Sequence, residues 1–172
     1  MGLIFDVLSA INDPKKVASV ESLGGIYDGI QQLAGNHGLN SAATQSIVSS
    51  VGDQLRTSLQ KQATGGNAVD IAGLIGKFAT GRSTGASLQS LIPDSAQQLL
   101  LKGMTDKLGL SSTGALGLVG SLAPLLLKFL NLGSSSQGVG SNPILTTFLD
   151  SNHDGNVDLG DALKFAGRFL TR

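Results

Sequence analysis

The chain has 172 residues, of which 41% are hydrophobic and 14% are charged, and its twelve basic and twelve acidic side chains cancel at pH 7. This balance leaves no net field that would draw the chain to nucleic acid or to an anionic membrane. Cysteine is absent, which excludes disulfides, thiolate metal sites and a cysteine nucleophile. Hydrophobic content of this size is enough to build a buried core.

The first sixteen residues, MGLIFDVLSAINDPKK, have no basic region before their apolar stretch. A Sec signal peptide needs such a region, so we expect none and take the cytoplasm as the default location. The alternative is the cell surface or the extracellular space, reached by a non-Sec route.

Apolar residues recur at spacings of three and four along most of the chain, and sustained alternation is missing. Asp13 and Pro14 predict the N-cap and first position of a helix whose apolar stripe covers residues 17–33. Further helices are expected over residues 40–63, 67–80, 93–108 and 111–131. The sequence therefore predicts an all-α fold, a compact helical bundle.

Two segments of the chain repeat one pattern. Residues 37–60, HGLNSAATQSIVSSVGDQLRTSLQ, align without gaps on residues 108–131, LGLSSTGALGLVGSLAPLLLKFLN. In each copy a glycine closes the preceding helix, a leucine packs beside it, a serine caps the next helix and a long apolar helix follows. The paired residues include Gly38 with Gly109, Leu39 with Leu110, and Ser41 with Ser112. We predict two pseudo-repeated helical hairpins within a helical body over residues 1–132.

This glycine-leucine-serine pattern, followed by a long Ala/Val/Leu helix with a proline before a leucine run, resembles the bacterial YidB-like family. The resemblance covers residues 37–131 and implies a bacterial, all-α module without enzymatic activity. The first copy departs from the pattern, because Asp53 stands where the second copy has Pro124.

After the body comes GSSSQGVGSN, residues 133–142, which has the composition of a flexible linker. Asn142 and Pro143 then begin a short helix that leads into LDSNHDGNVDLGDALKFAGRFL, residues 149–170. Twelve positions starting at Asp150 match the calcium loop of an EF-hand, so residues 143–172 are predicted to form an EF-hand helix-loop-helix.

Calcium takes six to eight oxygen ligands, and alternate residues of a tight loop supply them. The expected ligands at positions 1, 3, 5, 7, 9 and 12 are Asp150, Asn152, Asp154, Asn156, Asp158 and Asp161. Gly155 at position 6 makes the sharp turn, and Val157 at position 8 is expected to anchor the loop against the body or against a second chain.

Position 12 carries Asp161 where an EF-hand usually has glutamate. The pattern also resembles the calcium loops of dockerin modules, which use aspartate there, although a dockerin has two such segments and this chain has one. The shorter side chain should weaken Ca²⁺ binding and let Mg²⁺ compete. The alternative is an acidic turn that only caps the following helix.

No catalytic constellation stands out, since His37 lies in a predicted turn and His153 at position 4 of the loop. We therefore expect a non-enzymatic, calcium-binding interaction module whose partner is a protein or a second copy. A self-assembling structural subunit with calcium-dependent oligomerisation is the first alternative. A membrane-active protein that uses residues 114–132 is the second, because this is the most apolar stretch.

Overall fold

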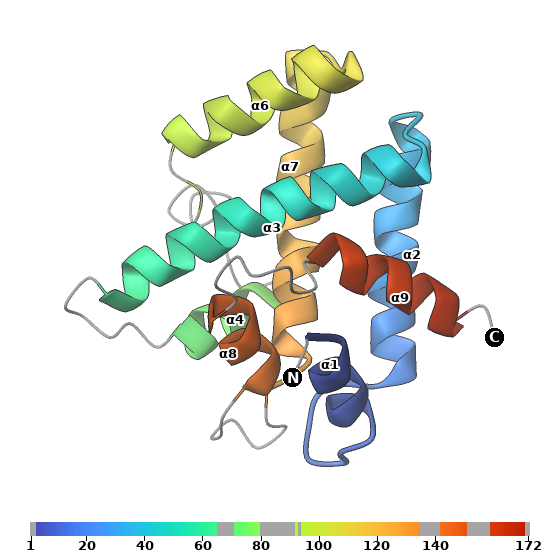
Figure 1. The fold of residues 1–172 in the computed structure, drawn as a ribbon, viewed down its shortest axis with the longest axis vertical. Helices are drawn as coiled ribbons and strands as arrows, with labels where there is room; N and C mark the ends of the chain where they lie inside the picture. The colour runs from blue at the N-terminus through green and yellow to red at the C-terminus, as the bar shows by residue number, and fades with distance from the viewer. Residues whose placement is uncertain are drawn as a thin grey trace.

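The structure is a computed structural model that describes residues 3–64, 71–79, 92, 94–134, 142–150 and 159–170. Within these ranges the chain is helical and contains no strand, which confirms the predicted all-α fold (Figure 1). The helices are α1 (Leu3–Ile11), α2 (Val20–Asn36), α3 (Ser41–Thr64), α4 (Ile71–Ala79), α6 (Asp94–Leu108), α7 (Ser112–Asn131), α8 (Pro143–Asp150) and α9 (Leu159–Leu170).

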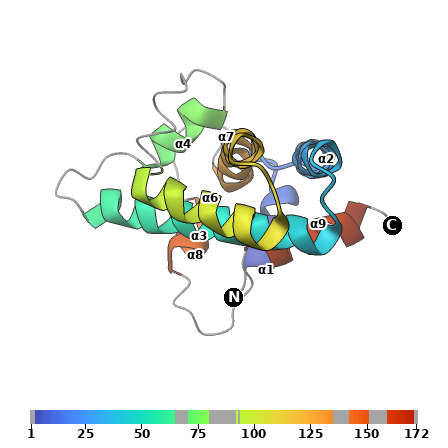
Figure 2. The same cartoon turned by 90° about the horizontal axis from the view of Figure 1, so that it is seen from above.

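Helix α7 is the centre of the bundle, and α2, α3, α4, α6 and α8 all pack against it. Figure 2 looks roughly along α7 and shows α2 and α4 on either side of it, with α3 crossing below. A helix enclosed in this way must be apolar on most of its surface, and α7 is. Its buried residues are Ala115, Leu118, Val119, Leu122, Ala123, Leu126, Leu127, Phe129 and Leu130.

Among the described residues, α7 is also the one helix long and apolar enough to cross a membrane. Half of its most apolar window is buried inside the bundle, however. Packing against the other helices of the bundle therefore accounts for about half of this apolar surface.

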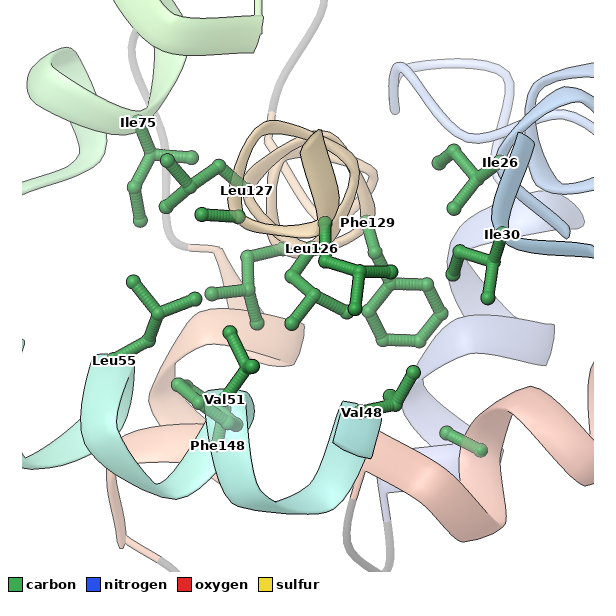
Figure 3. Packing of buried hydrophobic residues seen from close by; sticks show 14 of the residues in the cluster. Ile26, Ile30, Val48, Val51, Leu55, Ile75, Leu126, Leu127, Phe129 and Phe148 are labelled. Atoms are coloured by element: carbon green, nitrogen blue, oxygen red, sulfur yellow. The ribbon is translucent and has the colours of Figure 1, made fainter. Parts of the chain in front are cut away.

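Helix α3 crosses α7 and contributes several fully buried residues to the core. Val48, Val51 and Leu55 are inaccessible to solvent and, as Figure 3 shows, point toward the leucines of α7. Their spacing of three and four residues puts them on one face of the helix. The apolar stripe expected from the sequence is thus the buried face of α3.

In the structure, a glycine with left-handed backbone ends the preceding helix in both predicted repeat copies. Gly38 and Gly109 both have a positive φ, 63° and 65°; Gly38 follows His37, the C-cap of α2, and Gly109 follows the last residue of α6. At Gly38 the end is a Schellman motif, because Leu39 N donates to Ala34 O and Gly38 N donates to Gly35 O. At Gly109 a single bond from Gly109 N to Thr105 O makes the simpler left-handed motif.

The capping residues of the repeat lie one position earlier than predicted. Asn40 Oδ1 accepts from Ala43 N at 2.8 Å, and Ser111 Oγ accepts from Gly114 N at 3.1 Å. Ser41 and Ser112 are instead the first helical residues of α3 and α7. Both residues of each pair, Asn40 and Ser41 or Ser111 and Ser112, have a side-chain oxygen that can cap a helix. Residue type alone therefore does not identify the N-cap.

Replacing Gly38 or Gly109 by alanine should lower the free energy of unfolding by roughly 1 kcal/mol, because a Cβ disfavours left-handed backbone. Neither position has another atom within 4 Å of the added Cβ, so the cost is conformational and asparagine should restore part of it. Gly35→Ala is the matched control: it lies in the last turn of α2, has the same open surroundings and should be stabilising. Urea unfolding of the variants tests this, and equal effects at Gly35 and Gly38 would contradict it.

The N-terminal region differs from the prediction. Asp13 and Pro14 do not begin a helix; they form a turn in which Asp13 Oδ1 accepts from Lys15 N at 2.9 Å. Helix α2 begins at Val20, with Ser19 as its N-cap, and α1 lies outside the helices expected from the sequence. An Asp-Pro pair suits the first two positions of a β-turn as well as a helix start, which explains the error.

The segment after α7 is joined to the core at both of its described ends. Leu132 and Gly133 are buried after α7, Val17 N donates to Ser134 O, and Asn142 is buried before α8. Helices α8 and α9 contribute Ile144, Leu145, Phe148, Ala162 and Ala166 to the same hydrophobic core as the body.

Candidate calcium-binding site

The structure places the two ends of the predicted calcium loop on helices. Helix α8 ends at Asp150, which is loop position 1, and α9 begins at Leu159, position 10, so that Asp161 is its third residue. The remaining predicted ligands Asn152, Asp154, Asn156 and Asp158, and the loop-shaping Gly155 and Val157, lie outside the described residues. The described residues contain no group of three or more histidine or acidic side chains that could hold a metal ion. Coordination of an ion stays a prediction from the sequence.

Asn142 fixes the start of α8. Its Oδ1 accepts from Leu145 N at 3.0 Å, which makes it the N-cap, as the Asn-Pro pair suggests. Its Nδ2 donates to Leu130 O at 2.8 Å and to Ser134 Oγ at 3.2 Å. The side chain is 6% exposed, so these bonds are shielded from water. One amide therefore ties the beginning of α8 to the end of α7.

Asn142→Ala should lower the free energy of unfolding by about 1–3 kcal/mol, because it leaves Leu145 N and Leu130 O without their buried partner. Asn142→Asp keeps the oxygen that accepts from Leu145 N and loses the amide group that donates to Leu130 O. It therefore separates the stability contributed by the N-cap from the stability contributed by the bond to α7. Thermal unfolding measures both variants. A loss no larger for Asn142→Ala than for Ser46→Ala, an exposed site on α3, would contradict this role.

The C-terminal half of α8 is held by hydrogen bonds to α3 and α1. Gln60 Nε2, from α3, donates to Leu149 O at 2.5 Å, one residue before Asp150. Thr147 Oγ1 donates to Asp6 Oδ2 of α1 at 2.6 Å. These two bonds, together with the burial of Phe148 at 5% exposure, hold the helix that delivers the first predicted ligand.

Helix α9 approaches its neighbours through glycine. A Cβ at Gly160 would collide with Ser49 Oγ and lie 2.9 Å from Gln45 O, both on α3. A Cβ at Gly167 would lie 2.7 Å from the Tyr27 hydroxyl oxygen of α2. Such contacts are too close for any side chain, so glycine is required for α9 to pack where it does.

Both ends of the predicted loop are therefore docked on one helix. Gln60 of α3 holds the carbonyl before Asp150, and α3 also packs against Gly160, which comes just before Asp161. A rigid helix thus sets where the first and last predicted ligands begin. Placing ligands on rigid elements reduces the entropy lost when an ion binds.

Asp150 and Asp161 occupy opposite helix ends. Asp150 is the last residue of α8, where the helix dipole is negative, and Asp161 lies in the first turn of α9, where it is positive. The helix dipole therefore contributes to stability with opposite signs at these two positions.

Sequence reasoning found the Asn142 cap, which the structure confirms, and the calcium loop stays a prediction. It missed Gln60, Ser49 and Tyr27 as residues that contact α8 and α9. Comparison with protein-family models, with curated proteins and with solved structures found no match for this chain.

Proposed function

We propose that the protein is a calcium-binding, non-catalytic helical module in which Ca²⁺ orders the hairpin formed by α8, the loop and α9. The observation that supports this most is that the helices end at loop position 1 and begin at position 10, as in a helix-loop-helix calcium site. Both helices also pack into the common core.

The charge of the loop gives the physical reason for an ion. Four aspartates lie within twelve residues, and like charges at such spacing repel unless a cation neutralises them. An ion that binds the folded chain alone stabilises it by mass action, by about 2.7 kcal/mol at one hundred times the dissociation constant.

The ligand set favours calcium over other metals. All six predicted ligands provide oxygen, which suits Ca²⁺ and Mg²⁺, and neither cysteine nor histidine takes part. Asp161, one methylene shorter than glutamate, should weaken Ca²⁺ binding and leave Mg²⁺ as a competitor. The proposed partner is a protein or a second copy of the chain.

Thermal unfolding with calcium and with chelator tests the proposal. We expect Ca²⁺ to raise the Tm of the wild-type chain and to leave Asp154→Ala unchanged, because that variant lacks the ligand at position 5. Ser151→Ala is the matched control, since position 2 carries no ligand and calcium should still raise its Tm. A Tm that does not respond to millimolar calcium in the wild type would leave the loop as an acidic helix cap.

A self-assembling subunit is the second candidate. Phe5 of α1 and Leu99 of α6 are 58% and 68% exposed, and burying either side chain against a second copy would be favourable. Light scattering with calcium and with chelator tests this: a calcium-dependent increase in mass supports assembly, and a monomer under both conditions ends the idea.

A further inference from the structure

Helix α1 lies on the two helices that flank the predicted calcium loop. Among the described helices, it packs more extensively against α8 and α9 than against any helix of the body (Figure 1). Its buried residues Leu3, Val7 and Ala10 are spaced by four and three positions, so they form one face of the helix. The docking surface for this apolar face is therefore mainly the hairpin.

A hydrogen bond also joins α1 to the last turn of α8. Thr147 Oγ1 donates to Asp6 Oδ2 at 2.6 Å, and Thr147 lies three residues before Asp150, the first position of the predicted loop. A hydrogen bond to a carboxylate is charge-assisted and is among the stronger ones in proteins. Helix α1 thus holds the part of α8 that has to stay in place when Asp150 binds an ion.

Helix α1 depends on this docking to be a helix at all. It has nine residues, and isolated helices shorter than about 12–15 residues are marginal in water. The connection between α1 and α2 is held separately, because Val17 N donates to Ser134 O at 3.0 Å. Helix α1 can therefore leave the hairpin by local unfolding while the body stays folded.

We propose that α1 is coupled to the calcium hairpin: its docking on α8 and α9 raises the affinity of the loop for calcium, and bound calcium in turn holds α1 in place. This inference rests on the proposed function and adds a positioning element outside the helix-loop-helix itself. Linkage makes the coupling reciprocal, so both effects have the same size. Loss of calcium loosens the hairpin, and α1 then loses the surface that keeps it helical.

Amide hydrogen exchange of the whole chain, followed by NMR in chelator and in saturating calcium, tests one direction of the coupling. We expect calcium to slow the exchange of α1 amides by about fivefold or more, together with those of α8 and α9. Helix α6 is the internal control, because it packs against α3 and α7 and lies far from the hairpin (Figure 1). Its amides should exchange at nearly the same rate under both conditions.

Calorimetric titration of calcium into variants of α1 tests the other direction. Asp6→Ala removes the acceptor for Thr147 and should weaken calcium binding by about fivefold. Asp6→Asn keeps an oxygen at that place and should restore most of the affinity, although it also lacks the negative charge. Ser9→Ala changes an exposed residue of the same helix and should leave the affinity unchanged.

The outcomes separate this coupling from calcium binding itself. No binding of calcium to the wild-type chain would contradict both the proposed function and the coupling. Calcium binding with equal slowing of exchange in α1 and α6, or with unchanged affinity in Asp6→Ala, would leave the proposed function standing and overturn the coupling alone. Equal losses of affinity in Asp6→Ala and Asp6→Asn would mean that only the charge of Asp6 acts on the ion, and would also overturn it.

Discussion

Replacing Leu127 by alanine is expected to lower the free energy of unfolding by about 2–5 kcal/mol, the largest effect of any substitution considered for this chain. Leu127 lies on the central helix α7, has no exposed surface and points toward Ile75 of α4 in Figure 3. The shorter side chain loses burial energy and leaves a cavity between two helices that are packed tightly together.

Leu116→Ala is the control for this prediction, because it makes the same change on the same helix at a residue that is 49% exposed. Helix propensity changes equally in both variants, so their difference isolates burial. Urea unfolding should show a clear fall in the midpoint for Leu127→Ala and a small change for Leu116→Ala. Similar midpoints for the two variants would mean that α7 is not the core of the bundle.

Substituting Asp150 and Asp161 by asparagine is expected to abolish most calcium stabilisation in both cases, while changing the calcium-free protein in opposite directions. Without calcium, Asp150→Asn removes a negative charge from the C-terminal end of α8 and should raise stability by about 0.3–1 kcal/mol. Asp161→Asn removes one from the first turn of α9 and should lower stability by a similar amount.

Thermal unfolding in chelator and in excess calcium gives the Tm of each variant under both conditions. A ligand role predicts that both variants lose the response to calcium, whereas a simple helix cap predicts that neither the wild type nor the variants respond to calcium and that only their stabilities in chelator differ. Retention of the full calcium response by both variants would exclude the EF-hand assignment of positions 1 and 12.

The sequence predicted the fold well wherever apolar spacing was long and regular. Helix α3 and helix α7 carry such spacing, and the glycines at 38 and 109 were correctly expected to close the helices before them. The start of α2 was wrong because two local signals compete there: Asp13 and Pro14 look like a helix start, and the true cap is Ser19. Short-range patterns do not decide between a turn and a cap.

Only some of the contacts that position α8 and α9 could be predicted from the sequence. Asn142 could be found, because an Asn-Pro pair before an apolar run is a local capping signal. The bond from Gln60 to Leu149 joins residues 89 positions apart, and the contact of Gly160 with α3 depends on how two helices cross. Such contacts follow from tertiary packing and leave no signal in one sequence.

Calorimetric titration of calcium into chelator-treated protein tests the central claim most directly. We predict binding of one ion per chain in the wild type, loss of that binding in Asp154→Ala, and its retention in Ser151→Ala. Absence of binding heat together with an unchanged Tm at millimolar calcium would contradict the claim, and the acidic loop would then be a cap on α9.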